Sequence, residues 1–367
     1  MLSFAGSDPF KTAMEASLQS IMPTDYAVTL PFSVLPLDDR ELGIDGSPWK
    51  SADPAIMSLL TDRAAMRRYC RESGLIVPAG VEAMDLEGLA RWAMQFRRFP
   101  LTLKACRNGS GGRGVYRLEG FRELNTYFDH LREKDGEKGL LRIEEWVEPK
   151  AMIELTVGPD DYRMTSQIGR EPNLTCRTAW RIYPVNIPAS LRPGVETILK
   201  AFAAFQPLPK GCLLRFTIAL TAKDAVLISL NAGFNRLEYL PDWLTGDKTE
   251  STDAALMRLF RQPSAANIPD SIRCMEGASC KTSPGSSSAS DQKMRLQFYR
   301  RSAKEDAFPV LLPKPAEGLP VKRYASTGRR AVALLAGNDI ITLNKSAKLL
   351  QTLLATEDSS DLGKDSE

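Results

Sequence analysis

A run of closely spaced glycines between two short strand patterns restricts the folds open to this chain more than any other feature. Residues 109–114 hold four glycines in six positions, after the strand pattern Leu101–Lys104. Glycine lets the backbone bend tightly, so consecutive N–H groups can point at one anion. No Gly-Lys-Ser/Thr closes the run, and a strand pattern (Val115–Leu118) follows it, which excludes a Walker A loop and a dinucleotide-binding fingerprint. A phosphate-binding loop and a merely mobile hairpin loop both stay open.

Composition excludes several functional classes. A single histidine, His130, leaves almost nothing for a histidine base or a histidine-rich metal site. The six cysteines include no CxxC pair and indicate buried thiols in a reducing compartment. Lysine and arginine (48) nearly balance aspartate and glutamate (45), which gives no reason to expect nucleic acid or a membrane surface as partner. No apolar run approaches the roughly 20 residues of a spanning helix and no secretory pattern opens the chain, so we expect a cytoplasmic protein.

Apolar periodicity and capping residues predict alternating helices and strands. Asp53 followed by Pro54 begins one helix, and Thr61 caps a second over 62–73 that Gly74 ends. Adjacent Arg67 and Arg68 are interpreted as solvated charges of that helix. Further helices are predicted over 121–131, 195–202 and 344–355. Strands are predicted within 26–35 and over 101–104, 140–147, 152–157, 212–220 and 225–231, the last two joined by a turn at 221–224.

The order of these elements resembles the ATP-grasp superfamily, and is most similar to biotin carboxylase and the large chain of carbamoyl phosphate synthetase. Four segments carry the resemblance: 61–78, 100–115, 140–157, and the strand pair 212–220 with 226–234. The stretch 304–318 also looks like the one that follows the ATP-grasp core of biotin carboxylase. The resemblance covers roughly 53–355 and implies an α+β fold whose two subdomains clamp ATP.

The resemblance also implies a division of the chain. Residues 1–52 would be the remnant of an N-terminal pre-ATP-grasp region, and 53–245 the ATP-grasp core, with the glycine-loop subdomain at about 100–147. A linker with a Ser/Gly-rich segment would span 246–293, and a small C-terminal α/β unit 294–355. The acidic tail 356–367 has the composition of a disordered segment.

Carried over by position, the nucleotide site would include two cations that bind the ATP phosphates, the glycine loop, and a hinge that holds adenine. The cations are Arg63 and Lys104. The loop residues are Gly109, Ser110, Gly111, Gly112, Arg113 and Gly114, and the hinge residues are Glu144, Glu145, Trp146 and Val147. The plainer interpretation makes the two glutamates an exposed strand edge and the other two hinge residues ordinary core.

The metal site of the family departs from its pattern here. The resemblance implies two magnesium ions, held by a carboxylate on a late strand and by a Glu-x-Asn-x-Arg run on its partner. These positions read Arg215 and Ser229-Leu230-Asn231-Ala232-Gly233. Period two and the turn at 221–224 predict that Arg215 lies near Asn231, and Thr217 near Ser229. Of the family's ligands only Asn231 is present, which could hold at most one ion. The arginine of the run is replaced by Gly233, and Arg236 lies nearby in sequence.

A buried arginine facing two magnesium ions would cost several kcal/mol. Three interpretations stay open: Arg215 contacts the phosphates of an inactive site; one metal persists through Asn231; or another register lets Asp224 or Glu238 supply a carboxylate. Two functions follow. One is a non-catalytic nucleotide-binding regulatory or scaffold protein with a protein partner or a second copy of itself. The alternative is an active ATP-dependent carboxylate-amine ligase or biotin-carboxylase-like enzyme that forms an acyl- or carboxy-phosphate. ATP is the expected ligand of both, and whether Mg²⁺ binds differs among the interpretations.

Overall fold

The computed structural model describes residues 2–5, 28–31, 52–107, 115–135, 139–158, 163–172, 176–183, 185, 187–206, 208, 212–232, 293–301, 311–312, 314–327 and 330–356. The glycine loop 109–114, Arg236, Glu238, the linker up to residue 292 and the tail from residue 357 lie outside the described residues.

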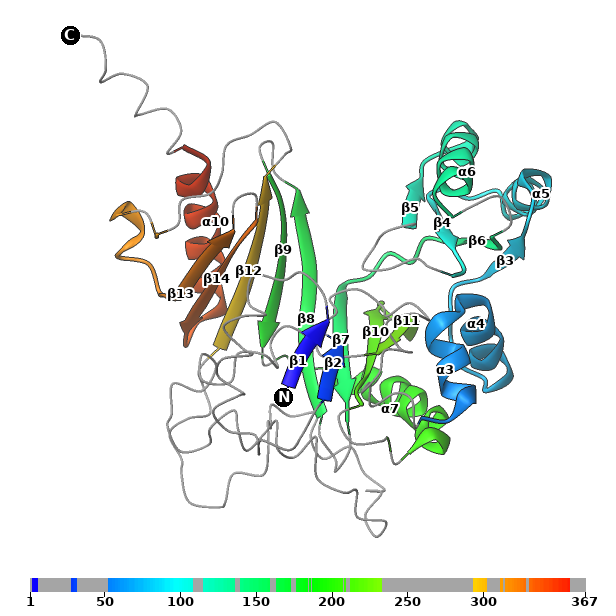
Figure 1. Ribbon diagram of the computed structural model, residues 1–367, viewed down its shortest axis with the longest axis horizontal. Helices are drawn as coiled ribbons and strands as arrows, with labels where there is room; N and C mark the ends of the chain where they lie inside the picture. Colours follow the sequence, from blue (N-terminus) through cyan, green and yellow to red (C-terminus); the bar gives the residue numbers. More distant parts are fainter. Residues whose placement is uncertain are drawn as a thin grey trace.

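Helices and strands are mixed along the chain (Figure 1). The helices of eight or more residues are α3 (Pro54–Thr61), α4 (Arg63–Glu72), α5 (Leu86–Phe96), α6 (Phe121–Asp135), α7 (Arg192–Ala201) and α10 (Ile340–Thr356). The strands are β1 (Leu2–Ala5), β2 (Val28–Pro31), β3 (Gly80–Ala83), β4 (Leu101–Ala105), β5 (Val115–Leu118), β6 (Leu141–Glu145), β7 (Ala151–Val157), β8 (Arg163–Pro172), β9 (Cys176–Tyr183), β10 (Leu214–Leu220), β11 (Ala225–Ala232), β12 (Lys293–Arg301), β13 (Val321–Thr327) and β14 (Arg330–Gly337).

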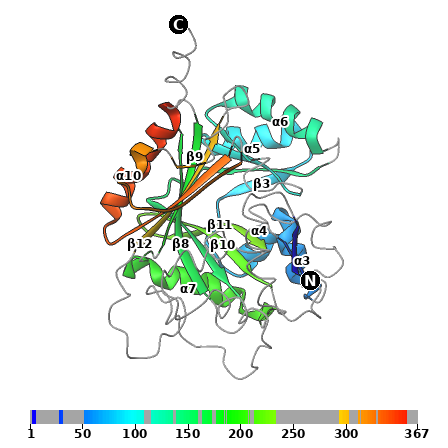
Figure 2. The ribbon, with the colours of Figure 1, turned by 60° about the vertical axis from the view of Figure 1, so that its left-hand side comes forward.

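Two antiparallel sheets organise the molecule. The large sheet has eight strands in the order β11-β10-β7-β8-β9-β12-β14-β13, and the small sheet has four in the order β3-β6-β4-β5. The short strands β1 and β2 form a separate parallel pair. This mixed architecture confirms the predicted α+β class. Figure 2 shows α10 on one side of the large sheet, with α5 and α6 of the small-sheet unit on the other.

The start of the first helix pair shows one confirmed and one wrong capping prediction. Asp53 caps α3 by accepting a 2.8 Å hydrogen bond from the N–H of Ala55. Thr61 does not cap α4, because its hydroxyl donates to a carbonyl within α3. Asp62 takes that place and accepts from two N–H groups of the first turn of α4, at 2.8 and 3.2 Å. Gly74 follows this helix with a φ of 69°, the left-handed conformation that favours glycine.

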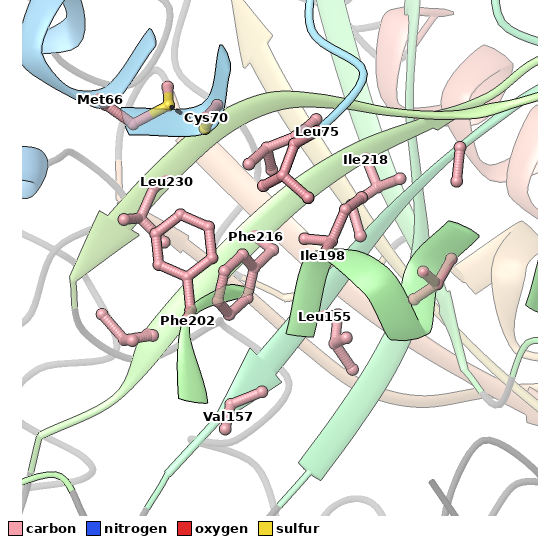
Figure 3. Packing of buried hydrophobic residues seen from close by; sticks show 14 of the residues in the cluster. Met66, Cys70, Leu75, Leu155, Val157, Ile198, Phe202, Phe216, Ile218 and Leu230 are labelled. Carbon is pink, nitrogen blue, oxygen red and sulfur yellow. Dashed lines mark hydrogen bonds between the residues drawn. The ribbon is translucent and has the colours of Figure 1, made fainter. Parts of the chain in front are cut away.

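Alternation along β7 and β10 gives this end of the large sheet one apolar and one polar face. Phe216 of β10 and Leu155 of β7 are directly paired and both point into the core beneath α7 (Figure 3). Phe202, just after α7, packs on Phe216 with ring centroids 5.1 Å apart and planes at 70°. Helix α10 covers the same face further along, over β12 and β14. The polar residues that alternate with Phe216 therefore point to the opposite side.

We expect Phe216→Ala to lower the free energy of unfolding by about 3–5 kcal/mol, because a fully buried ring leaves a cavity in a close-packed core. Urea denaturation followed by circular dichroism measures this change. Ile341→Ala on the exposed side of α10 is the matched control and should stay within about 0.5 kcal/mol of the parent. Equal effects of the two substitutions would contradict the core described above.

The small sheet includes two elements that the sequence pattern did not predict, β3 and α5. Asp85 caps α5 by accepting from the N–H of Gly88 at 2.6 Å. Leu89 and Ala93 of α5 are fully buried against Leu103 of β4 and Ile143 of β6. The opposite face of this sheet carries charged side chains, and these form the first part of the site.

Candidate functional site

The β10–β11 hairpin pairs the residues that were predicted to lie near each other. Arg215 pairs with Asn231, and Thr217 pairs with Ser229. Asp224 is exposed in the turn, at the far end of the hairpin from Asn231. A bulge between the Thr217–Ser229 and Ile218–Leu227 pairs leaves Ile228 as an extra residue of β11. The hairpin therefore presents an arginine, an asparagine and two hydroxyl groups on one face.

A buried carboxylate on the neighbouring strand completes this polar face. Glu154 of β7 pairs directly with Thr217 and is only 4% exposed. Its carboxylate forms an ion pair with Arg181 of β9, and its Oε2 lies 3.8 Å from Nε of Arg215. Arg215 is itself 3% exposed. Sequence reasoning did not single out Glu154, because the alternation of residues 152–157 places it on the polar face but does not indicate that it is buried.

The charged face of the small sheet centres on Glu144 of β6. Lys104 of β4 forms an ion pair with Oε1 of Glu144, and Nε of Arg142 donates to Oε2 at 2.8 Å. Arg142 also forms an ion pair with Glu82 of β3. The plainer prediction of an exposed strand edge is wrong for Glu144, which is 1% exposed. Gly80 of β3 lies opposite Glu144, and its lack of a side chain lets β3 and β6 lie close together there. A Cβ at this position would lie 2.3 Å from a carbonyl oxygen of β6.

Burial and neighbouring charges shift the pKa values of both Glu144 and Lys104. Burial alone would raise the pKa of Glu144, but Arg67, Lys104 and Arg142 together lower it to about 2. Burial lowers the pKa of Lys104 to about 8, against the opposing attraction of Glu144. Both groups are therefore charged at neutral pH. The cations exceed the carboxylates around Lys104, which favours an anion there.

Arg63, the second predicted phosphate cation, is the first residue of α4 and contacts the end of β4. Its guanidinium donates to the carbonyl oxygen of Ala105, and its backbone N–H donates to that of Cys106 at 2.9 Å. Its charge contributes to the lowered pKa of Lys104. The structure thus brings Arg63 of α4 beside β4, the strand that carries Lys104.

The predicted hinge connects the two sheets. Glu145 ends β6, and its carboxylate accepts from the N–H of Ala79 at 3.0 Å. Trp146 follows, half-buried, with the guanidinium of Arg117 4.7 Å above its ring centre and its indole N–H donating to Glu148. Val147 is also half-buried, between β6 and β7.

No family model and no curated protein matches this sequence. Solved structures do match its fold. Phosphoribosylamine–glycine ligase from Thermotoga maritima is 15% identical with a TM-score of 0.59, covering 92% of this chain and 85% of its own. N5-carboxyaminoimidazole synthetase from Staphylococcus aureus, complexed with ADP, is 12% identical with a TM-score of 0.58, covering 95% and 96%. Carboxyaminoimidazole ribonucleotide synthase from Aspergillus clavatus, complexed with ATP, is 14% identical with a TM-score of 0.54, covering 84% and 75%.

The chain has the ATP-grasp fold. The small sheet carries Lys104, and the large sheet carries Arg215. The described helices include none that is both long and apolar enough to cross a membrane.

The two-magnesium arrangement expected of the ATP-grasp fold does not fit the residues present. Arg215 stands where a ligand carboxylate is expected, and Glu154 beside it is engaged by two guanidinium groups. Ser229 offers a neutral hydroxyl, and Nδ2 of Asn231 donates to it at 3.2 Å. Within the described ranges, no three histidine, cysteine, aspartate or glutamate side chains gather in an arrangement that could hold a metal.

Proposed function

We propose that this chain is an ATP-grasp nucleotide-binding protein whose catalysis is lost or strongly impaired, and that it acts as a regulatory or scaffold protein. The observation that carries the proposal is the buried pair of Arg215 and Glu154 at the position of the expected metal ligands. Its partner would be another protein or a second copy of the chain, and its compartment the cytoplasm.

The nucleotide half of the proposal depends on the cations of the small sheet. Lys104 and Arg63 would bind the phosphates, because hydrogen bonds between a cation and a phosphate are stronger than those between neutral groups. The loop 109–114 would close over them, and the backbone of 144–147 would read the adenine edge. Arg215 would face the phosphates from the large sheet.

The loss of catalysis follows from the same exchange of charge. Phosphoryl transfer depends almost entirely on positioning and on stabilising the charge that develops on the transferred group. A guanidinium fixed by Glu154 adds one positive charge, whereas a magnesium ion carries two and coordinates the phosphate oxygens directly. ATP would be held without being turned over.

Calorimetric titration with ATP, in EDTA and then in Mg²⁺, tests this proposal. We expect the two affinities to agree within about threefold, because Arg215 places a positive charge at the phosphates without a metal. The Arg215→Glu variant is the matched comparison and should bind ATP only with Mg²⁺. A wild-type protein that binds ATP solely with Mg²⁺, or binds none, would overturn the proposal.

The second candidate is an active ATP-dependent ligase that forms an acyl- or carboxy-phosphate. The observation in its favour is the similarity to a structure named as a phosphoribosylamine–glycine ligase, over 92% of this chain. Phosphate release from ATP with a panel of carboxylic acids and amines separates the two. Turnover by the wild type, not increased in Arg215→Glu, would establish the ligase and exclude the non-catalytic protein.

A further inference from the structure

Arg67 of α4 lies between the two sheets and not in solvent. The interpretation of Arg67 as a solvated charge is wrong, since its side chain is 2% exposed, whereas the neighbouring Arg68 is exposed as expected. Its Nη1 donates to the carbonyl of Leu227 at 2.6 Å, and its Nη2 donates to that of Ile228 at 2.7 Å. Nη2 also lies 3.2 Å from Oε1 of Glu144. One side chain thus connects α4, the small sheet and β11.

The β11 bulge makes this double contact possible. Successive carbonyls of a regular strand point to opposite sides, so two adjacent ones rarely face one donor. Ile228 is the extra residue of the bulge, and β11 is the edge strand of the large sheet. The two carbonyls therefore turn together towards α4, immediately before Ser229 and Asn231. Only a planar guanidinium offers donors spaced for both carbonyls and a carboxylate.

We propose that Arg67 is a positioning residue that couples phosphate binding at Lys104 to the strand bearing Ser229 and Asn231. The inference rests on the proposed nucleotide site. Glu144 is the shared element, because its Oε1 contacts both Lys104 and Arg67. A phosphate that binds Lys104 weakens the ion pair between Lys104 and Glu144. The carboxylate of Glu144 then interacts more strongly with Arg67. This orders the guanidinium of Arg67 and strengthens its hydrogen bonds to β11.

Two substitutions separate the charge of Arg67 from its geometry. Arg67→Lys keeps the charge but loses the planar set of guanidinium donors. The affinity for ATP should therefore fall about tenfold or more, while the affinity for adenosine stays unchanged. Arg67→Met also removes a positive charge close to Lys104 and so raises the pKa of Lys104. The loss of ATP affinity that follows deprotonation of Lys104 should therefore occur at higher pH. Arg63, Arg142, Glu82 and Glu144 are the other charged groups around Lys104 in the described chain, and all are kept in both variants. Arg68→Met, one residue along, is the control and should change neither quantity.

Hydrogen exchange of the wild type gives a second measurement that needs no variant. ATP, but not adenosine, should slow exchange of the β11 amides over 226–232. The inference is overturned if ATP leaves that exchange unchanged, or if Arg67→Lys binds ATP as the wild type does. Equal loss of ATP and adenosine affinity would also overturn it, since that indicates a merely structural role. A wild type that binds no ATP at all contradicts the proposed function instead.

Discussion

Replacing Lys104 with methionine is expected to lower the affinity for ATP by about 10- to 150-fold, measured by calorimetry. This corresponds to about 1.5–3 kcal/mol for a hydrogen bond to a charged group. Methionine keeps the length and volume of the side chain, and Glu144 retains Arg67 and Arg142 as partners, so the fold should survive. Lys223→Met, in the exposed turn between β10 and β11, is the control and should leave the affinity unchanged.

The pH dependence of binding gives an independent check on the same residue. Lys104 has a pKa of about 8 and carries its charge below that value. The affinity for ATP should therefore be full near pH 7 and decline as the pH rises through 8 towards 9. This limb should be missing in Lys104→Met. An affinity that stays level up to pH 9 in the wild type, or a substitution without effect, would exclude Lys104 from the phosphate site.

Glu144→Gln is expected to lower the free energy of unfolding by about 3–5 kcal/mol, the usual cost of removing one member of a buried ion pair. The substitution leaves Arg67, Lys104 and Arg142 buried around a neutral amide. Urea denaturation at pH 7 measures the change. Glu87→Gln on the exposed side of α5 also breaks an ion pair, but a solvent-exposed one, and should cost less than about 1 kcal/mol.

Acid titration separates the charge of Glu144 from its packing. Its folded-state pKa of about 2 lies below the ordinary value of 4.5, so the ionised form stabilises the fold above pH 4.5. That contribution is lost as the pH falls from 4.5 towards 2. The difference in stability between the wild type and Glu144→Gln should therefore shrink over this range. A constant difference would show that shape, and not charge, accounts for the loss.

The hairpin at the candidate metal position was largely predictable because two local rules come close to its register there. The strand period places Arg215 and Thr217 on one face, and the four-residue turn sets their partners on β11 to within one residue. The bulge at Ile228 supplies the last step, because it moves the partners from Leu230 and Ile228 to Asn231 and Ser229. Neither rule depends on distant parts of the chain. The caps at Asp53 and Gly74 were predictable for the same reason, while Thr61 and Asp62 are adjacent capping residues that only the folded geometry distinguishes.

Arg67 and Glu154 were beyond sequence reasoning because their roles depend on tertiary contacts. Arg67 and Arg68 are chemically identical neighbours, and only the packing of α4 between two sheets decides which one is buried. Glu154 becomes notable through Arg215 on β10, the strand beside β7, and through Arg181 on β9, which β8 separates from β7. A charged residue in an alternating strand otherwise indicates an ordinary solvent-facing position.

The pairing of β9 with β12 has a consequence for how the protein is made. Tyr183 ends β9 and Lys293 begins the strand that covers it, about 110 residues later. At roughly 5–20 residues per second, a ribosome needs about 6–20 s to add that interval. Until then the backbone groups along the outer side of β9 have no neighbour, and nascent chains on one messenger could pair there with each other. Slow translation between the two strands should lower the yield of folded monomer, whereas supplying 293–356 as a separate polypeptide should rescue a chain truncated before β12.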